Sequence, residues 1–360
     1  MTRLLLTGVG GFIGHHVAQW ILARTDWEIL GVDTWHWRHR GDRARIGQEL
    51  LPYVKEGRLK LFKADLSVPL SERTENLLLS RELSLGKAIE KPIDYIINMA
   101  SDSHVTRSIH DPESCWMNNC ALILHMLEFA RRVRPKKFIQ ISTDEVYGEA
   151  SWDAEKGHPE WDTILPSNPY SASKAAQEAL AISYWRTYGV PVCITNTMNV
   201  IGERQEPEKF LPMVIQKVMY DEPVDIHADS PERIARRVFL DVKNMADALL
   251  FLLQETADYP AYQEGKGAKR PMRVNICGDR EMTVLEMAQM AALMLGRELK
   301  YQLVKGDSVR PGYDRRYALD GSLLASMGWK PPYSFEQTLR RIILWTSGHP
   351  EWLIRSRSLA

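Results

Sequence analysis

Short apolar runs alternate with amphipathic stretches of helical length through the first half of the chain, and this alternation constrains the fold more than any other feature. The runs are RLLLTG, WEILGVD, LKLFKAD, DYIINMA, KKFIQIS and VPVCITN. Runs of this length, separated by helices, are typical of a parallel sheet covered on both faces. The pattern predicts an α/β protein with a doubly wound parallel sheet. The segment 66–92 is long for one crossover, so we expect an extra helix or loop within it.

The sequence changes character after residue 198, where prolines and loops become frequent. We expect residues 1–198 to form the sheet domain, with residues 238–256 returning to it as a strand and a helix. Residues 199–237 and 257–360 then form a smaller C-terminal substrate-binding domain. Ligands of such folds usually bind at the carboxyl edge of the sheet.

A glycine-rich turn follows the first apolar run, in LLLTGVGGFIGHHVAQWIL. Gly8 permits the tight turn, Gly11 lets the backbone approach a pyrophosphate, and Gly14 allows the next helix to pack closely on the strand. The N-terminus of that helix offers free N–H groups and a favourable dipole to an anion. The spacing is G-x-x-G-x-x-G, and the order of strand, glycines, helix and second strand predicts a Rossmann-type dinucleotide site.

The carboxylate that ends the second apolar run indicates which dinucleotide binds. Asp33 lies 19 residues beyond Gly14, where it can accept hydrogen bonds from a ribose diol. Its charge would repel a 2′-phosphate, so NAD is favoured over NADP. Arg38 and Arg40 follow in WHWRHR and could host a phosphate, which weakens this preference without reversing it.

A tyrosine and a lysine are spaced four residues apart at the start of a predicted helix, in PSNPYSASKAAQEAL. Asn168 suits the N-cap and Pro169 suits the first helical position. Tyr170 and Lys174 then share one face, where an ammonium would lower the phenol pKa toward a value useful for taking a proton from an alcohol. An ordinary surface pair is the alternative, but the dinucleotide motif upstream favours the catalytic interpretation.

Two adjacent carboxylates, Asp144 and Glu145, follow an apolar run in QISTDEVYG. Neighbouring like charges repel, and a buried carboxylate is costly unless it is paired or protonated. A solvated acidic turn is the simplest interpretation of this pair. An acid–base pair is the alternative.

Composition excludes several classes of function. Lys plus Arg equals Asp plus Glu at 46 each, so no overall charge favours nucleic acid or an anionic membrane. The N-terminal apolar run is too short for a signal peptide and no window approaches transmembrane length, so we expect a cytoplasmic protein. We expect free thiols and no metal site, because the four cysteines are scattered without a C-x-x-C pair: Cys115, Cys120, Cys193 and Cys277.

The glycine turn TGVGGFIG and the helix start YSASK resemble those of the extended short-chain dehydrogenase/reductase superfamily. Within it, the chain is most similar to the dTDP-glucose 4,6-dehydratase family, through SDSHVTRSI, STDEVYG, PSNPYSASKA, PEKFLP and RPGYDRRYALD. Sugar-nucleotide epimerases lack the full last string. The resemblance implies conversion of an NDP-hexose, with dTDP-glucose expected first, to its 4-keto-6-deoxy form with tightly held NAD.

The resemblance also implies a role for each catalytic residue. Tyr170 would take the C4 hydroxyl proton, and Lys174 would tune it and bind the nicotinamide ribose. Thr143 would hydrogen-bond the 4-oxygen. Asp144 would be the general acid for the C6 hydroxyl, and Glu145 the general base for the C5 proton. Opposed roles require the pKa values of the two carboxyl groups to differ, and neighbouring like charges push them apart.

Further residues are implied as ligand contacts. The cofactor set is Gly8, Gly11, Phe12, Ile13, Gly14, Asp33, Asp65, Leu66, Ala100, Ser101, Tyr170 and Lys174, with Thr195 beside them. The substrate set is Ser103, His104, Asn199, Lys209, Arg237, Arg310 and Tyr313. Arg237 and Arg310 would clamp the pyrophosphate, because planar guanidinium groups bind it well. Arg315 and Arg316 could be structural ion-pair partners instead.

Some positions depart from the family pattern. These departures leave the sugar and the base of the substrate undetermined, but they have little effect on the expected reaction class. Asp102 replaces a glutamate, Ile201 replaces an aromatic residue, Asn98-Met99 replaces a His-Leu pair, and segment 149–165 is shorter and rich in tryptophan.

Two other functions stay open at this point. A 4-epimerase or UDP-glucuronate decarboxylase on the same fold would not need the Asp144–Glu145 pair. A non-catalytic NAD-binding protein should have lost Thr143, Tyr170 or Lys174, and all three are present. The stretches CALILHMLEFARRV and SKAAQEALAISYWRTY read as long helices with broad apolar faces, which relatives pair into a four-helix bundle, so a homodimer is expected.

Overall fold

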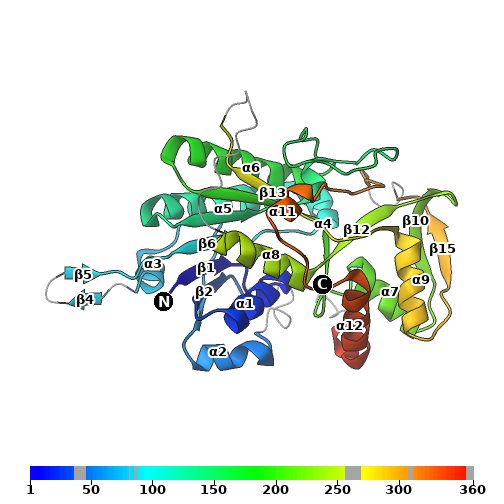
Figure 1. Ribbon diagram of the computed structural model, residues 1–360, viewed down its shortest axis with the longest axis horizontal. Helices are drawn as coiled ribbons and strands as arrows, with labels where there is room; N and C mark the ends of the chain where they lie inside the picture. Colours follow the sequence, from blue (N-terminus) through cyan, green and yellow to red (C-terminus); the bar gives the residue numbers. More distant parts are fainter. Residues whose placement is uncertain (36–45, 81, 85–86, 256–268, 307–310, 354–360) are drawn as a thin grey trace. The chain divides into compact units, whose positions relative to one another are not determined.

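The computed structural model describes residues 1–35, 46–80, 82–84, 87–255, 269–306 and 311–353 (Figure 1). The described residues form two compact units. Unit 1 contains Met1–Val146, Asn168–Asn196 and the described part of Ala246–Val274. Unit 2 contains Tyr147–Ser167, Thr197–Met245 and the described residues from Asn275 onward.

Unit 1 is built on a seven-stranded sheet of order β13-β8-β7-β6-β1-β2-β3. Neighbouring strands from β3 to β8 all run parallel; for example, Leu5 of β1 lies between Leu30 of β2 and Ile96 of β6. The order reverses between β1 and β6, which confirms the doubly wound sheet and creates the switch point where such folds bind ligands. The strands are β1 (Arg3–Thr7), β2 (Glu28–Asp33), β3 (Leu59–Lys63), β6 (Tyr95–Asn98), β7 (Lys137–Ile141), β8 (Val192–Thr197) and β13 (Met272–Ile276).

Helices cover both faces of this sheet. Two long helices, α5 (Pro112–Val133) and α6 (Pro169–Tyr188), lie side by side on one face (Figure 1). The opposite face carries α1 (Phe12–Arg24) and α8 (Val242–Gln254), where the Trp20 indole donates to Asp247 at 3.1 Å. Leu5, Phe138 and Ile194 are fully buried in the core beneath α5 and α6. Apolar strand residues on both faces explain why the runs carry no polar alternation.

The smaller elements of unit 1 fill the connections. η2 (Gln48–Leu50) and α2 (Leu51–Lys55) precede β3, and α4 (Val105–His110) precedes α5. The expected extra structure within 66–92 is confirmed as a helix, α3 (Glu72–Leu78), which Ser71 caps, and a hairpin of β4 (Glu82–Ser84) and β5 (Lys87–Ile89).

The segment 238–256 returns to unit 1 only in part. Its helical portion from Ala246 onward belongs to unit 1. Its strand belongs to β12 (Arg236–Asp241), which pairs with β9 (Asn199–Ile201) and β14 (Glu281–Thr283) and not with the seven-stranded sheet, so that part of the prediction is wrong. The sheet edge beside β8 is occupied by β13 instead.

Unit 2 combines two small sheets with several helices. The first sheet has the order β14-β12-β9 and the second the order β11-β10-β15. Buried side chains from the helices of unit 2 form one apolar core, which includes Leu211, Met287 and Leu339. The remaining elements are α7 (Phe210–Met219), β10 (Val224–Ser230), β11 (Arg233–Ile234), α9 (Val284–Met294), β15 (Tyr301–Val304), α11 (Ser322–Ser326), α12 (Phe335–Gly348) and η4 (Pro350–Trp352).

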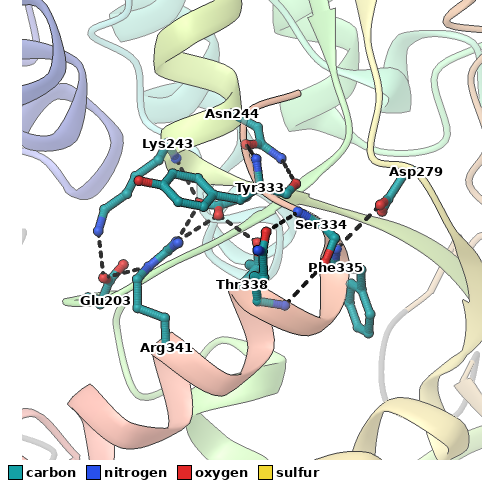
Figure 2. A network of polar contacts seen from close by, with 11 residues as sticks. Glu203, Lys243, Asn244, Asp279, Tyr333, Ser334, Phe335, Thr338 and Arg341 are labelled. Atoms are coloured by element: carbon teal, nitrogen blue, oxygen red, sulfur yellow. Dashed lines mark hydrogen bonds and ion pairs between the residues drawn. The ribbon is translucent and has the colours of Figure 1, made fainter. Parts of the chain in front are cut away.

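A polar network joins α12 to the end of β12 inside unit 2 (Figure 2). Arg341 donates to both oxygens of Asp241 at 2.8 and 2.7 Å and to Glu203 at 2.9 Å. Lys243 also donates to Glu203, at 2.9 Å. Burial alone would raise the pKa of Glu203, but the charges of Arg341 and Lys243 outweigh it and lower that pKa to about 2. The network is a structural link between elements far apart in sequence.

In the part of the chain that the structure describes, no helix combines the length and apolar character needed to cross a membrane.

Candidate active site

The residues predicted to be catalytic come from two adjoining elements of unit 1. β7 ends at Ile141, and the chain then turns into η3 (Asp144–Val146), which carries both carboxylates. α6 begins at Pro169 behind the N-cap Asn168, whose side chain accepts a hydrogen bond from the Ser171 amide. Tyr170 therefore sits in the first turn of α6 and Lys174 one turn further on, as predicted from the sequence.

The two carboxylates are buried, which excludes the solvated acidic turn. Asp144 is 3% exposed and Glu145 is 9% exposed. The Thr143 hydroxyl donates to Asp144 Oδ1 at 3.0 Å, while the Asn168 amide donates to Glu145 Oε2 at 3.0 Å. The two acids thus have different hydrogen-bond donors, one from the preceding residue and one from the N-cap of α6.

Tyr170 is a buried phenol held neutral. Burial raises its pKa well above the usual range, and the charges of Glu145 and Asp144 raise it further. A hydrogen bond with Thr143 acts in the opposite direction but is a smaller effect. The net shift is opposite to the lowering by Lys174 that the spacing predicts, because spacing reveals neither the burial nor the two carboxylates supplied by η3.

The Lys174 ammonium is buried and directed at two acceptors. Its Nζ donates to the Ile141 carbonyl at 2.6 Å and to the Gln177 amide oxygen at 2.7 Å. Burial lowers the pKa of Lys174 to about 8, although Glu178 and then Cys115 oppose that shift. At neutral pH the ammonium form predominates, and small changes around it can shift its charge.

Glu178 connects α6 to β13. It forms an ion pair with Arg273 that is almost fully buried, at 0% and 1% side-chain exposure. Its other oxygen accepts from the Asn196 amide at 2.7 Å, and that amide also donates to the Thr143 carbonyl at 3.2 Å. Sequence reasoning missed Glu178, Gln177 and the Asn168 contact to Glu145. Positions three and four residues after Lys174 lie on its helix face, a signal that could have found the first two.

The glycine turn has the geometry of a phosphate cradle. Gly8 has a φ of +73°, which favours glycine, and a Cβ on Gly14 would lie 2.0 Å from the Gly8 carbonyl oxygen. A Cβ on Gly11 would lie 3.3 Å from the same oxygen. Gly11 is also the N-cap of α1 and offers no side-chain cap, so the first N–H groups of this helix are available to an anion. The cradle fits a dinucleotide pyrophosphate.

Asp33 is hydrogen-bonded to this turn and to Trp35, a residue that sequence reasoning did not single out. Its Oδ2 accepts from the Gly10 amide at 2.9 Å and its Oδ1 from the Trp35 amide at 3.1 Å. A Cβ on Gly10 would lie 2.9 Å from the Trp35 ring, which explains the extra glycine in TGVGGFIG. Carboxylate oxygens can accept further hydrogen bonds, so these contacts leave room for a ribose diol.

Parallel strands bring the other predicted cofactor residues to the same edge of the sheet. Asp65 follows β3, where its Oδ1 accepts from the Ser67 amide at 2.8 Å. Ala100 follows β6, and its amide donates to Thr7 Oγ1 at 3.0 Å. The remaining members lie beside them: Phe12 and Ile13 open α1, Leu66 follows Asp65, Ser101 follows Ala100, and Thr195 is buried in β8.

The predicted substrate residues are divided between the two units. Ser103 and His104 lie in unit 1, where His104 caps α4 by accepting from the Arg107 amide at 3.2 Å. Asn199, Lys209, Arg237 and Tyr313 belong to unit 2. Arg310, Arg38 and Arg40 lie outside the described residues.

Arg237 organises the 313–317 segment of unit 2. Its guanidinium donates to the main-chain carbonyls of Arg315 and Asp314, each at 2.7 Å, and it lies 4.3 Å from the centre of the Tyr317 ring. Arg315 and Arg316 form ion pairs with Asp229 at 2.5 Å and Glu281 at 2.7 Å, as the structural interpretation of these two arginines predicts.

A doubly wound sheet with a glycine cradle, and a buried Tyr–Lys pair beside two buried carboxylates, define a dinucleotide-dependent enzyme of the short-chain dehydrogenase/reductase type. Comparison with known proteins agrees. The model of the NAD dependent epimerase/dehydratase family matches residues 4–265, and the chain belongs to this family.

Relatives within the family include 4,6-dehydratases. The dTDP-glucose 4,6-dehydratase of Haemophilus influenzae is 31% identical over 364 residues, which cover 96% of this chain and 98% of that protein. The resemblance to dTDP-glucose 4,6-dehydratases seen in the motifs is therefore confirmed. The trifunctional UDP-glucose 4,6-dehydratase/3,5-epimerase/reductase of Arabidopsis thaliana is 31% identical over 97% of this chain. The chain spans only 48% of that protein's length.

Solved structures show the same architecture. The dTDP-glucose 4,6-dehydratase of Streptomyces venezuelae, crystallised with NAD, is 27% identical, with a TM-score of 0.77 over 98% of both chains. The UDP-glucose 4-epimerase of Thermus thermophilus also has a TM-score of 0.77, at 23% identity over 96% of this chain and 99% of the epimerase. At that identity the epimerase match shows the fold alone, so the choice between dehydratase and epimerase rests on the site.

Proposed function

We propose that the protein is an NAD-dependent nucleotide-sugar 4,6-dehydratase, which converts an NDP-hexose into the 4-keto-6-deoxy derivative and water. The observation that carries this proposal is the buried Asp144–Glu145 pair beside Tyr170, in which each carboxylate has its own hydrogen-bond donor. An enzyme that only oxidises and re-reduces C4 needs no such pair. Elimination of water needs both an acid and a base.

The first step uses Tyr170 as the base for the C4 hydroxyl. Bound NAD would supply the hydride acceptor for C4 and later the hydride donor for C6. Thr143 contacts both Tyr170 and Asp144, and these contacts support a role in which its hydroxyl would hold the 4-oxygen. Lys174 would bind the nicotinamide ribose through the donor hydrogen left over from its two protein contacts.

The elimination divides between the two carboxylates. Oxidation of C4 makes the C5 proton α to a carbonyl, so Glu145 can remove it as a general base. Asp144 then gives a proton to the departing C6 hydroxyl. The Asn168 amide donates to Glu145 Oε2 and would hold the candidate base in place.

Cofactor and substrate contacts follow from the family resemblance and from the contacts of each residue. The glycine cradle would hold the NAD pyrophosphate, and Asp33 would hold the adenosine ribose and reject a 2′-phosphate. In unit 2, Arg237 would contribute to binding the substrate pyrophosphate, with Arg310, Lys209 and Asn199 assigned to the same role. Arg237 already donates to three main-chain carbonyls of its own unit, those of Arg236, Asp314 and Arg315. Its removal should therefore weaken substrate affinity partly by loosening the 313–317 segment.

The chain is also proposed to act as a homodimer through α5 and α6. Four large apolar side chains are exposed on these helices: Trp116 at 44%, Met117 at 62%, Leu124 at 40% and Tyr188 at 49%. Met117 and Leu124 are seven residues apart and lie on one face of α5, with Arg131 a further seven residues on. Such a stripe suits a helix–helix interface with a second copy.

The proposal is tested by incubating the purified enzyme with dTDP-glucose, UDP-glucose and GDP-mannose separately and weighing each product by mass spectrometry. We expect one of these sugars, most of all dTDP-glucose, to give a product that is lighter by the mass of one water. The reaction should need no added NADH. A product of unchanged mass that co-elutes with a 4-epimer, or a product that has lost carbon dioxide when UDP-glucuronate is supplied, would replace the proposal with an epimerase or a decarboxylase. Inertness toward all of them would indicate a non-catalytic protein.

A further inference from the structure

Gln177 lies one turn beyond Lys174 on α6 and is fully buried. Its amide oxygen accepts two hydrogen bonds, from Lys174 Nζ at 2.7 Å and from Gln140 Nε2 at 2.9 Å. Its amide nitrogen donates to the Asn119 carbonyl of α5 at 2.8 Å. The side chain thus makes three hydrogen bonds to three different elements.

The contacts continue as a chain of side chains beneath the helix. Gln140 Oε1 accepts from Asn98 Nδ2 at 2.8 Å, and Asn98 Oδ1 accepts from the Thr7 hydroxyl at 3.0 Å. Thr7 Oγ1 in turn accepts from the amides of Met99 and Ala100, at 2.9 and 3.0 Å. This amide relay, made of Thr7, Asn98, Gln140 and Gln177, runs from the strand that precedes the glycine turn to the Lys174 ammonium.

Each member of the amide relay has one possible orientation. All four side chains are at most 1% exposed, and a buried amide or hydroxyl is stable only when its donors and acceptors are matched. Because Gln140 Nε2 is a donor, the atom of Gln177 facing it must be the oxygen. That same oxygen faces Lys174, so the relay determines what the ammonium meets.

Space filling alone does not explain these residues. Gln140 lies within a strand whose neighbours Phe138, Ile139 and Ile141 are apolar, and apolar side chains would fill the same volume without a matched network. The Lys174 ammonium, by contrast, needs buried acceptors wherever it is charged. Gln177 and the Ile141 carbonyl are the two that receive its hydrogens in this structure.

We propose that Gln177 is a positioning residue for Lys174: the amide relay holds its side-chain oxygen in place, and that oxygen fixes the direction and the charge of the ammonium. The proposal rests on the proposed function, in which Lys174 assists the oxidation at C4. It adds a fully buried residue that acts through Lys174.

The other charged and titratable groups around Lys174 remain in place when Gln177 is changed. Glu178 of α6 favours the ammonium form and is itself paired with Arg273 of β13. The Cys115 thiol of α5 acts in the same direction as Glu178 but less strongly. A change in the pKa of Lys174 on replacing Gln177 can therefore be assigned to the lost or altered amide.

The test compares two replacements of Gln177 that should shift the pKa of Lys174 in opposite directions, both made in the full chain. Gln177→Met keeps the volume and removes the acceptor, while Gln177→Glu keeps the acceptor and adds a negative charge. Tyr184→Phe is the matched control, because it removes one hydrogen bond of the same helix, to Glu128 at 2.5 Å, away from Lys174. The readout is the pH titration of the Lys174 Nζ signal in protein labelled with ¹⁵N-lysine, assigned by its loss in Lys174→Met.

We expect Gln177→Met to lower the pKa of Lys174 by about one unit or more and Gln177→Glu to raise it, with the control unchanged. With the substrate found active, Gln177→Met should reduce kcat for the oxidation by about tenfold or more and leave KM within about threefold. Equal titration of Lys174 in wild type and both variants would overturn the proposal, and so would a shift in the same direction in both. The titration needs no turnover, so it tests the role of Gln177 even if no sugar is dehydrated.

Discussion

The Asn168 side chain joins the two halves of the candidate site. Its oxygen caps α6 by accepting from the Ser171 amide at 3.0 Å, and its nitrogen donates to Glu145 Oε2 at 3.0 Å. The residue that begins the helix of Tyr170 and Lys174 therefore also orients the candidate base. An N-cap could have been a serine or aspartate with similar effect on the helix. The donor nitrogen is what those residues lack.

Replacement of Asn168 by serine should separate these two functions. Serine can cap the helix, so Asn168→Ser should change the free energy of unfolding by less than about 1 kcal/mol, whereas Asn168→Ala should lose about 1 kcal/mol. Asn168→Ser should nevertheless lower kcat as strongly as Asn168→Ala, because both variants lose the amide nitrogen that donates to Glu145 Oε2. Chemical denaturation and steady-state kinetics measure the two effects. Parallel losses of stability and rate in the two variants would contradict a separate contact to the base.

Glu145→Gln should stop the reaction after the first step. The amide is nearly isosteric but cannot act as a base, so oxidation at C4 should survive while C5 deprotonation fails. Reduced-nicotinamide absorbance should appear with the substrate and persist, and release of water should fall by about 10²–10⁴-fold or more. Tyr170→Phe is the control that identifies the blocked step. It should prevent the oxidation at C4, so no reduced-nicotinamide absorbance should appear. Dehydration by Glu145→Gln at near the wild-type rate would remove Glu145 from the mechanism.

The buried ammonium of Lys174 predicts how stability depends on alkaline pH. Its folded-state pKa of about 8 lies below its ordinary value of 10.5, so the unfolded chain binds the extra proton between these values. Stability attributable to this group should therefore rise with pH from about 8 to 10.5, by on the order of 3 kcal/mol, and stay constant below pH 8. Denaturation of wild type and Lys174→Met across this range isolates the slope. A constant difference between the two proteins would show that Lys174 titrates normally.

Association through α5 predicts a dimer that a single charge can break. Leu124→Lys places a charge in the exposed stripe with Met117 and should convert a dimeric mass to a monomeric one in light scattering. Leu293→Lys is the matched control, because Leu293 is 79% exposed on α9 of unit 2 and should leave the mass unchanged. A monomeric wild type, or dissociation by both substitutions, would exclude this interface.

Local patterns in the sequence were sufficient for most of unit 1. The apolar runs became the central strands, because a strand buried on both faces needs apolar residues on both, and the glycines at 8 and 14 mark positions where a Cβ is strained or clashes. The helix start at Asn168-Pro169 also follows from local chemistry alone. These features are determined by neighbours in the chain.

Features that depend on distant partners were not predictable in the same way. RVFLD is as apolar as the strands of the central sheet, yet it pairs with β9 and β14, because an apolar strand pattern does not specify a partner. The upward shift of the Tyr170 pKa comes from carboxylates that η3 brings next to α6. Segment 147–167 belongs to unit 2 through main-chain hydrogen bonds such as those from Ala150 to Arg316 and from His158 to Ala318. A local sequence pattern does not predict such contacts.

The reaction in deuterated water tests the central claim most directly. If Glu145 removes the C5 proton and Asp144 protonates the leaving hydroxyl, the wild-type enzyme should release a 4-keto-6-deoxy product that has lost one water and carries one solvent deuterium at C5. The hydride that returns to C6 originates at C4, so C6 should acquire the substrate's own hydrogen when C4 is labelled. NMR of the product locates both labels. A product with unchanged mass and no deuterium at C5 would contradict the dehydratase account and leave an enzyme that acts on C4 alone.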